Sequence, residues 1–407
     1  MSKPSLNTQI LIATIAGLLF GWLASLASLP IQENSLYAAG LVGTLFIDLL
    51  KMILIPLVFC SITVGIANLR QHQQMNRVWI STLAFFFTSM AIAMVLALLV
   101  GHYFKPGAGL HMAMFEQALQ NYTAKQMTVS AFFAQFLHGL FVNPFKALAE
   151  GNILAAVIFA LFLGVALVLG GERYAYVRQL MQEMLEIVMR MVSWVMVLAP
   201  LGIAALLFKL AATQDMAMLQ SLASFVAVVL GTLLFHGAVI LPLILYAFTK
   251  HSPLWFWRGS RDALLTAFAT SSSAATLPVT LRCVTQNLQV KPEIGGFVVP
   301  LGATVNMDGT ALYEAAAALF VANLVGIELD WVHQLIVFFT AMLAAIGAPG
   351  IPSAGMVTMV MVLQSVGLPA EAIAILLPID RFIDTLRTAV NVEGDMVGSL
   401  VVQKLVD

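Results

Sequence analysis

The chain has 407 residues, of which 61% are hydrophobic and 10% are charged, and its mean hydropathy is +0.96. This composition over such a length is typical of a protein that crosses a membrane many times, because a soluble domain cannot bury so much apolar surface. The formal net charge of −1 gives no support for binding to nucleic acid. The sequence therefore predicts an all-α integral membrane protein whose main surroundings are a lipid bilayer.

Six apolar segments in the first 250 residues are long enough to cross a bilayer as helices. They lie at residues 10–29, 41–69, 79–100, 153–169, 188–208 and 225–248. Lysine and arginine gather at alternate ends of these segments, which places the N-terminus on the cytoplasmic side. No small-residue cleavage site follows the first segment, so it is interpreted as a retained helix. The polar stretch 116–130 is expected to form an external loop, and Cys60 and Cys283 are expected to be free thiols.

Two later segments are too polar, or too rich in glycine and proline, to cross the bilayer in contact with lipid. The sequence SRDALLTAFATSSSAATLPVTLRC at residues 260–283 has positive charge near both ends, so we expect a re-entrant hairpin that opens to the cytoplasm. The sequence AAIGAPGIPSAGMV at residues 344–357 lies in a region without lysine or arginine, so its hairpin should open to the outside. Each hairpin precedes an apolar span that contains polar residues. Such inverted repeats bind solutes near the middle of the membrane.

The last of these spans carries many charges on one side. Its polar side chains follow one another at spacings of four, three, four and four residues: Asp380, Asp384, Arg387, Asn391 and Asp395. At about 100° per residue they fall within an arc of roughly 80° and share one helix face. Each charge in mid-membrane costs roughly 2.5–3.5 kcal/mol on insertion scales, so this face predicts a site where solutes or ions neutralise charge. Pairing within the helix, such as Asp384 with Arg387, is the alternative. Asp308, beside Asn306 on the preceding span, supports the same interpretation.

Several motifs resemble the signature sequences of one transporter family. They are ATSSSAATLP at residues 269–278, NMDGTALYEA at 306–315, GIPSAG at 350–355, DTLRTAVNVEGD at 384–395, and NPFKALAEGNILAAVIFALFLG at 143–164. On these motifs the chain resembles, over essentially its whole length, the glutamate transporter family, the dicarboxylate/amino acid:cation symporters. The resemblance implies eight transmembrane helices and two re-entrant hairpins. It also implies a homotrimer in which part of each protomer moves across the membrane like an elevator.

The resemblance also divides the single unit 1–407 into two parts. It implies a scaffold that holds the trimer together, at about residues 1–77 and 128–212. It implies a transport part at about residues 78–104 and 216–407, with the hairpins at about 252–283 and 329–366. The expected location is a bacterial inner, cytoplasmic membrane.

The residues that match the family's substrate site point to an acidic amino acid. Arg387 occupies the position that holds the side-chain carboxylate of the substrate, and a guanidinium binds a carboxylate through two hydrogen bonds. Asp384 matches the position that binds the α-ammonium group, which dicarboxylates lack. Together these two residues imply L-aspartate or L-glutamate. The other residues of the implied substrate site are Ser271, Ser272, Ser273, Thr310, Ile351, Gly355, Thr388 and Asn391.

Three sodium sites follow from the same resemblance, and a dehydrated Na⁺ needs several hard oxygen donors. The first consists of Gly302, Asn306, Asn391 and Asp395. The second, deeper site consists of Phe85, Thr88, Ser89, Asn306 and Asp308. The third is a cage of carbonyl groups around Thr304, Met307, Ala345, Ile346 and Ala348. Packing is the alternative role of Met307.

Some positions depart from the family pattern. Ser271 and Thr385 stand where relatives carry an arginine. Arg381, three residues before Asp384, either takes over the task of that arginine or faces the membrane interface. Glu314 stands where archaeal relatives have glutamine and matches the proton-coupled animal transporters. Desolvation favours the neutral form of a carboxyl group in a span, so Glu314 is a candidate proton carrier, with a structural hydrogen bond as the alternative. Coupling to protons or potassium stays open at this point.

Other classes of function find less support. The sequence has no GxxxxGK[ST] motif for nucleotide-driven transport and no nucleophile–base motif of an enzyme. Its seven histidines lack the spacing of metal ligands. Two alternatives stay open: a proton-coupled C4-dicarboxylate carrier, if Asp384 does not contact the solute, and an anion or solute channel. The clustered polar face favours a carrier that encloses its solute.

Overall fold

The computed structural model describes residues 6–26, 29–67, 76–108, 138, 141–150, 153–213, 216–348, 350 and 354–406. Within these ranges the chain forms helices joined by turns and contains no β-strand, which confirms the all-α prediction. Cys60 and Cys283 are buried, free thiols, as predicted. The loop predicted at residues 116–130 and the predicted substrate-site residue Ile351 lie outside the described residues.

Helices occupy all six apolar segments that the sequence predicts before residue 250. They are α1 (Leu6–Ser25), α2 (Leu29–Ala67), α3 (Asn76–Phe104), α7 (Ile153–Gly170), α8 (Ala175–Thr213), and α9 (Met216–Phe235) with α10 (Leu241–Thr249), joined by the π-helical turn η4 (His236–Ile240). The short helix α6 (Pro144–Glu150) precedes α7. Three stretches of the described helices are long and apolar enough to cross a membrane: Arg77–Phe104, Ile158–Val195 and Gln220–Thr249.

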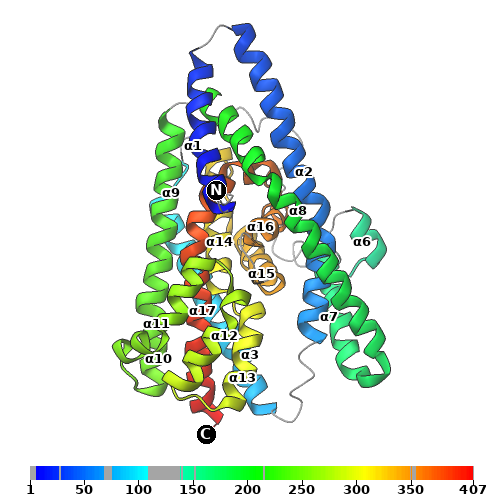
Figure 1. Ribbon diagram of the computed structural model, residues 1–407, viewed down its shortest axis with the longest axis vertical. Coiled ribbons are helices and arrows are strands. Elements are labelled where there is room, and N and C mark those ends of the chain that lie inside the picture. Colours follow the sequence, from blue (N-terminus) through cyan, green and yellow to red (C-terminus); the bar gives the residue numbers. More distant parts are fainter. Residues whose placement is uncertain are drawn as a thin grey trace, which may run out of the picture.

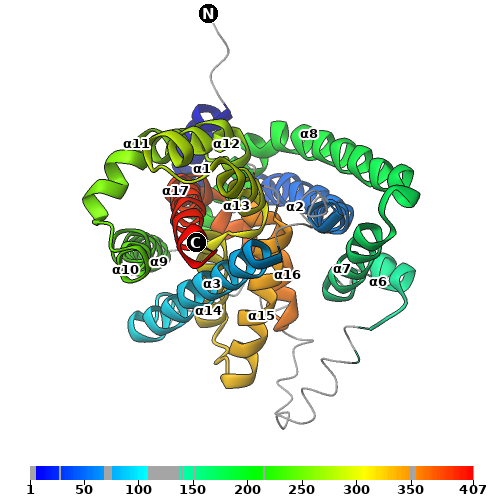
Figure 2. The same cartoon turned by 90° about the horizontal axis from the view of Figure 1, so that it is seen from below.

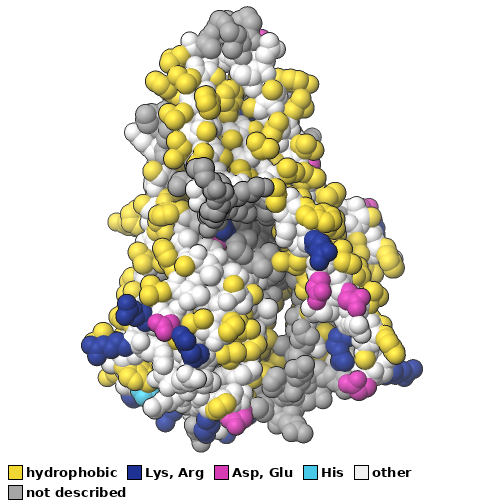
Figure 3. Space-filling view, in the orientation of Figure 1, with side chains coloured by type: hydrophobic (Ala, Val, Ile, Leu, Met, Phe, Trp, Pro, Cys, Tyr) yellow, Lys and Arg dark blue, Asp and Glu magenta, His cyan; other side chains and the backbone are white. Residues whose placement is uncertain are grey.

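The outer surface is apolar over much of the molecule. Figure 3 shows many hydrophobic side chains on the visible upper part, while most of the visible lysine, arginine and acidic side chains lie in the lower half. Phe20, Trp194 and Leu243 are among the large side chains that are more than half exposed. Such exposure is expected where helices face lipid rather than water.

Four helices pack together on one side of the molecule. The long helices α2 and α8 pack extensively against each other, α1 packs along α8, and α7 lies against α2 (Figure 1). Glycines allow the α1–α8 approach, because a Cβ on Gly17 would lie 2.6 Å from the Ala204 carbonyl oxygen. Small residues at such crossings let helix backbones come close in the absence of a hydrophobic driving force.

Two helix–turn–helix units occupy the ranges in which the hairpins are predicted. We call α11 (Pro253–Thr270) with α12 (Ser273–Arg282) hairpin 1, and α15 (Trp331–Gly347) with α16 (Ala354–Ser365) hairpin 2. Ser271 closes α11 in the left-handed conformation, with φ of 51°. The two tips touch, since the Ser272 hydroxyl donates a hydrogen bond to the Gly350 carbonyl oxygen at 2.7 Å. The backbone N–H of Ala274 donates to the same oxygen at 3.0 Å.

The interior is built around one continuous helix and one interrupted pair. Helix α17 (Ile373–Val406) runs through the middle of the other helices and packs against α3, α11, α13 and α14 (Figure 2). Helix α13 (Pro292–Val305) is followed by α14 (Asp308–Val325), and the two residues between them, Asn306 and Met307, are not helical. The break therefore frees backbone groups inside the protein, next to the charged face of α17.

Candidate functional site

The charged face of α17 lies in the protein interior. Its five polar residues are each at most 4% exposed: Asp380, Asp384, Arg387, Asn391 and Asp395. They share this burial because residues spaced by three or four positions stack on one side of a helix. Asp380 is 1% exposed, so it is covered by protein on every side. Charges buried this deeply need partners.

Ion pairs within α17 supply part of the neutralisation. Nη2 of Arg387 lies 2.5 Å from Oδ1 of Asp384, and Nε of Arg387 donates to the same oxygen at 3.1 Å. Nη1 of Arg387 lies 3.2 Å from Oδ1 of Asp380. The guanidinium also lies over the ring of Tyr313, 4.7 Å from its centroid. One arginine is thus bound by two carboxylates of its own helix.

Arg381 is turned toward this cluster. Its Nη1 lies 3.5 Å from Oδ2 of Asp384, and its side chain is 15% exposed. Asp384 is therefore flanked by two guanidinium groups, from Arg381 and Arg387. The pair between Arg381 and Asp384 is the contact that a spacing of three residues on a helix allows.

A small cavity adjoins Arg387 and gathers residues from four parts of the chain. It is lined by Ser271, Ser273, Met307, Thr310, Gly350, Gly355, Asp384, Arg387, Thr388 and Asn391. These residues come from the tips of both hairpins, the break before α14 with the first turn of α14, and α17. Eight of the predicted substrate residues are among them. Ser272 is instead turned to the Gly350 carbonyl oxygen.

The cavity is nearly closed. Its volume is about 10 Å³, about the space of one water molecule. Gly355 at the start of α16 presses on Arg387, because a Cβ there would lie 2.9 Å from Nη1 of the arginine. A solute larger than water can enter this cavity only if its lining residues move apart.

The residues of the first predicted sodium site lie together around the helix break. Nδ2 of Asn306 donates to Oδ1 of Asp395 at 3.1 Å. The Asp395 carboxylate lies against the backbone of Gly302, where a Cβ would overlap it. Oδ1 of Asn391 instead accepts a hydrogen bond from the Gly309 N–H at 2.7 Å. Oδ1 of Asn306 is buried without a hydrogen-bond partner among the described residues.

The second predicted sodium site centres on Asp308, which is fully buried. The Ser89 hydroxyl donates a short hydrogen bond to Oδ2 of Asp308. Oδ1 of Asp308 has no hydrogen-bond partner in the described part of the chain. Buried carboxylate and amide oxygens without donors are what a hard cation requires. Thr88 is exposed on α3, whereas Phe85 is buried.

The third predicted sodium set is divided between interior and surface. Ala345 and Ala348 are buried, Ile346 is half-buried, and Thr304 is exposed. The Thr304 hydroxyl donates to the Leu301 carbonyl oxygen at 3.0 Å. The sulfur of Met307 accepts from the side chains of Thr310 and Asn391, each at 3.7 Å. Met307 thus contacts polar residues of the cavity in addition to its packing.

Glu314 lies inside the protein on α14, two turns beyond Asp308, and is fully buried. The Thr358 hydroxyl of α16 donates to Oε1 of Glu314 at 2.5 Å. Oε2 has no hydrogen-bond partner among the residues described. A carboxyl group in this setting links α14 to hairpin 2.

His236 makes a contact with Asp308 that sequence reasoning did not predict. It lies in the π-helical turn η4, fully buried, with Nε2 at 3.1 Å from Oδ2 of Asp308. The only signal is an imidazole inside the apolar segment 225–248, without a ligand-like spacing to other residues. The contact joins residues 72 positions apart, so only packing brings them together.

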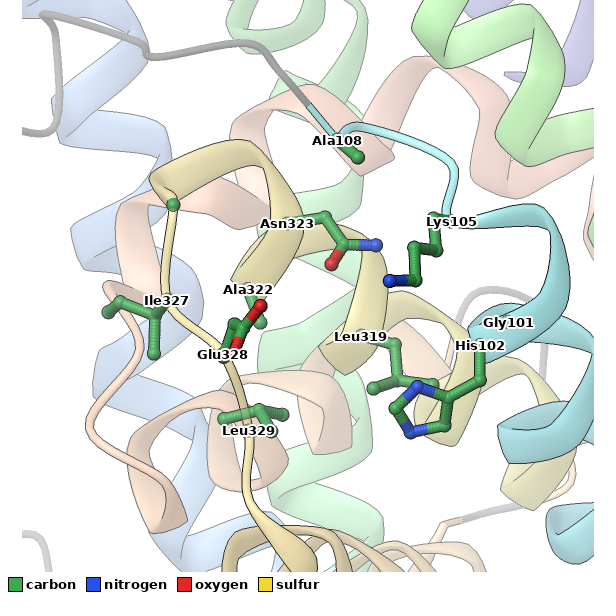
Figure 4. Close-up of a pocket in the computed structure, with 11 residues that line it drawn as sticks. Gly101, His102, Lys105, Ala108, Leu319, Ala322, Asn323, Ile327, Glu328 and Leu329 are labelled. Atoms are coloured by element: carbon green, nitrogen blue, oxygen red, sulfur yellow. The ribbon is translucent and has the colours of Figure 1, made fainter. Parts of the chain in front are cut away.

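A larger cavity, about 420 Å³, lies away from these residues. It opens between the ends of α3 and α14, where Lys105 and Glu328 lie on opposite sides and Asn323 lies between them (Figure 4). Nδ2 of Asn323 donates to the Pro106 carbonyl oxygen at 3.0 Å. None of the predicted substrate or sodium residues lines this cavity. Although it is the larger of the two cavities, it is therefore not the candidate substrate site.

Comparisons with known proteins find related sequences along almost the whole chain. The family described as "Sodium:dicarboxylate symporter family" matches residues 6–405. Excitatory amino acid transporter 3 of Homo sapiens is 33% identical, with 98% of this chain and 86% of that protein aligned. Excitatory amino acid transporter 2 of Mus musculus is 32% identical over 100% of this chain and 80% of that protein. An excitatory amino acid transporter of Caenorhabditis elegans is 32% identical over 97% of this chain and 87% of that protein.

Proposed function

The chain belongs to the sodium:dicarboxylate symporter family, and on this basis we propose that it carries L-aspartate or L-glutamate across the membrane together with sodium ions. The family consists of transporters and not of enzymes. The observation that carries the choice of substrate is the buried pair of Arg387 and Asp384 beside a cavity formed by both hairpin tips. This pair offers one cationic and one anionic group to a solute that has both charges.

Substrate recognition is an exchange of ion pairs. The side-chain carboxylate of the amino acid replaces Asp384 on the guanidinium of Arg387, and its ammonium group takes the place of that guanidinium on Asp384. The α-carboxylate is bound by Asn391 and the serines at the tip of hairpin 1. A neutral amino acid would bring no carboxylate to replace Asp384 on Arg387, and a dicarboxylate would bring no ammonium group to replace Arg387 on Asp384. Both losses are costly because buried polar groups without partners are penalised.

Sodium ions neutralise two further buried acidic groups, Asp308 and Asp395. Asp308 and Asp395 each provide a carboxylate beside Asn306, whose amide oxygen has no hydrogen-bond partner among the described residues. Asn391 connects these sites to the cavity, because it lines the cavity and accepts from the Gly309 N–H next to Asp308. Substrate and sodium are therefore expected to strengthen each other's binding by the same factor.

The proposal extends to the moving parts. Eight transmembrane helices and two re-entrant hairpins form each protomer of a homotrimer in a bacterial inner membrane. Residues 1–77 and 128–212 form the scaffold, and residues 78–104 and 216–407 move as an elevator. The packing of α1, α2, α7 and α8 with one another supports the first group. The packing of α3, α13 and α14 around α17 supports the second.

Glu314 is the proposed proton carrier. Its hydrogen bond with Thr358 connects it to hairpin 2, and it lies on the same helix as Asp308. In this proposal the carboxyl group is protonated in the loaded carrier and releases the proton on the cytoplasmic side, after which potassium is the candidate counter-ion.

Counterflow in proteoliposomes tests the proposed function. Purified protein should accumulate radiolabelled L-aspartate when a sodium gradient is imposed and should lose this accumulation when the gradient is removed. Unlabelled L-glutamate should compete, whereas succinate and L-asparagine should not. Competition by succinate without any sodium dependence would favour the proton-coupled C4-dicarboxylate carrier. Uptake of aspartate that never rises above its equilibrium distribution across the membrane would favour the channel.

A further inference from the structure

A buried acidic side chain on α17 has no part in the proposed transport cycle. Glu393 is 6% exposed and lies between Asn391 and Asp395 in the sequence. A step of two residues turns a helix by roughly 200°, so Glu393 points away from the face that carries these two residues. It faces the other side of the helix, where α11 packs. A carboxylate in that position needs a structural or functional reason.

The partner of Glu393 is a tryptophan of hairpin 1. Nε1 of Trp257, on α11, donates a hydrogen bond to Oε1 of Glu393 at 3.1 Å. The other oxygen, Oε2, lies against η4, since a Cβ on Gly237 would lie 3.0 Å from it. The carboxyl group is thus held between α11 and the π-helical turn. The absence of a side chain at Gly237 leaves room for it.

The position of this hydrogen bond along hairpin 1 matters for the substrate cavity. Trp257 and Ser271 are separated by 14 residues, which is about 21 Å along a helix. Two other polar contacts near the base connect the arms of hairpin 1 to each other: Nδ2 of Asn287 with the Gly259 carbonyl oxygen at 2.8 Å, and Arg282 with Asp262 at 3.1 Å. They do not attach α11 to α17. Beyond the second arm, the Lys291 N–H donates to Oε1 of Gln403 on α17 at 2.6 Å, so Trp257 is the contact that holds the first arm.

We propose that Glu393 is a positioning residue for transport: its hydrogen bond with Trp257 anchors hairpin 1 to α17. The anchor keeps the serines at the tip of hairpin 1 and Arg387 on α17 at one spacing across the cavity. A helix that shifts at its base carries its tip with it, so loss of the anchor displaces Ser271 and Ser273 from the substrate. This inference rests on the proposed function, because it assigns Glu393 a role in that same site.

The protein contains its own reporter for the packing at the base of hairpin 1. Cys283 follows α12 directly, is fully buried, and packs with the π-helical turn η5 (Cys283–Asn287) against α11. The second cysteine, Cys60, lies on α2 outside the proposed site. In a Cys60→Ser background, the rate at which a maleimide modifies Cys283 therefore measures how often the packing of η5 on α11, at the base of hairpin 1 beside Trp257, opens. This measurement needs no substrate.

Four substitutions in the full-length Cys60→Ser protein distinguish the effect of the hydrogen bond from the effects of side-chain charge and side-chain size. Trp257→Phe and Glu393→Leu remove the donor and the acceptor, while Glu393→Gln keeps an acceptor oxygen and removes the charge. Trp255→Phe is the matched control, because Trp255 lies on the same helix but stacks on His251, with ring centroids 4.1 Å apart. We expect the first two to be labelled roughly fivefold faster, the change that follows from losing one buried hydrogen bond worth about 1 kcal/mol. Glu393→Gln and Trp255→Phe should label like the parent.

Transport gives the second measurement. In Trp257→Phe the KM for L-aspartate should rise roughly tenfold while the maximal rate stays within about twofold, since binding geometry is altered and not the amount of carrier. Glu393→Gln should keep the KM of the parent. Parental labelling of Cys283 in Trp257→Phe would overturn the anchor, and so would a Glu393→Gln protein that behaves like Glu393→Leu. If the parent does not carry aspartate, the labelling still decides on the anchor, and only the proposed function fails.

Discussion

The carboxylate of Asp384 binds the guanidinium of Arg387, three residues later on the same buried helix, with nitrogen–oxygen distances of 2.5 and 3.1 Å. The protein thereby provides for Arg387 the kind of group that an acidic substrate would bring. The cavity beside them is only about 10 Å³, and in the proposed function substrate binding exchanges this pair for new ones. The exchange keeps the number of buried ion pairs from falling, and breaking a buried pair without replacement is strongly unfavourable.

Arg387→Thr should abolish the preference for acidic substrates. Removal of the guanidinium leaves the substrate carboxylate without its cation and should lower aspartate affinity by roughly 100-fold or more, as loss of one partner of a buried ion pair costs about 3–5 kcal/mol. Competition of labelled aspartate uptake by L-aspartate and by L-serine measures the change. Arg282→Thr, at an arginine that pairs with Asp262 on the surface, is the control. Full aspartate affinity in Arg387→Thr would exclude the assigned role.

Asp308→Asn and Asp395→Asn should each raise the sodium concentration needed for half-maximal uptake. Each change removes a buried carboxylate from a predicted sodium site, and reciprocal coupling then weakens aspartate binding at fixed sodium. Saturating sodium should partly restore the affinity. Asp262→Asn, at an exposed carboxylate, should have no such effect. If both interior variants kept the parental sodium dependence, these aspartates would be structural and coupling to protons alone would be favoured.

Glu314→Gln should mimic the permanently protonated carboxyl group. The variant should still bind and exchange aspartate, while its net uptake loses the response to an imposed pH gradient and to internal potassium. Thr358→Val, which removes the hydroxyl that donates to Oε1 of Glu314, tests the hydrogen bond separately and should keep the pH response. Wild-type uptake that ignores both pH and internal potassium would leave Glu314 with a structural role.

Gly355→Ala should weaken aspartate binding without unfolding the protein. A Cβ at this position would lie 2.9 Å from Nη1 of Arg387, so the guanidinium must shift within a closed cavity. We expect a loss of roughly tenfold in affinity, within the range of about 1–3 kcal/mol for overpacking. Gly231→Ala on α9 is the matched control, because a Cβ there meets nothing within 4 Å. Equal affinities in the two variants would show that hairpin 2 does not hold Arg387 in place.

Much of the site follows from helical periodicity alone. The five polar residues of α17 share a face because their spacing places them there in any α-helix, whatever surrounds it. The apolar segments likewise specify their helices, since a chain in lipid must satisfy its backbone hydrogen bonds within each segment. The break at Asn306 and Met307 is marked by polar residues in an apolar span. These features can be predicted from the order of residues along the chain, without knowledge of the tertiary contacts.

Contacts between distant segments depended on the tertiary structure. His236 meets Asp308 across 72 residues, and Trp257 meets Glu393 across 136. No local pattern connects these residues, because such contacts depend on how whole helices rotate and pack. The same packing leaves Thr88 and Thr304 exposed and turns Ser272 toward Gly350. The sequence by itself determined which face of each helix is polar, and helix packing decided which residues those faces meet.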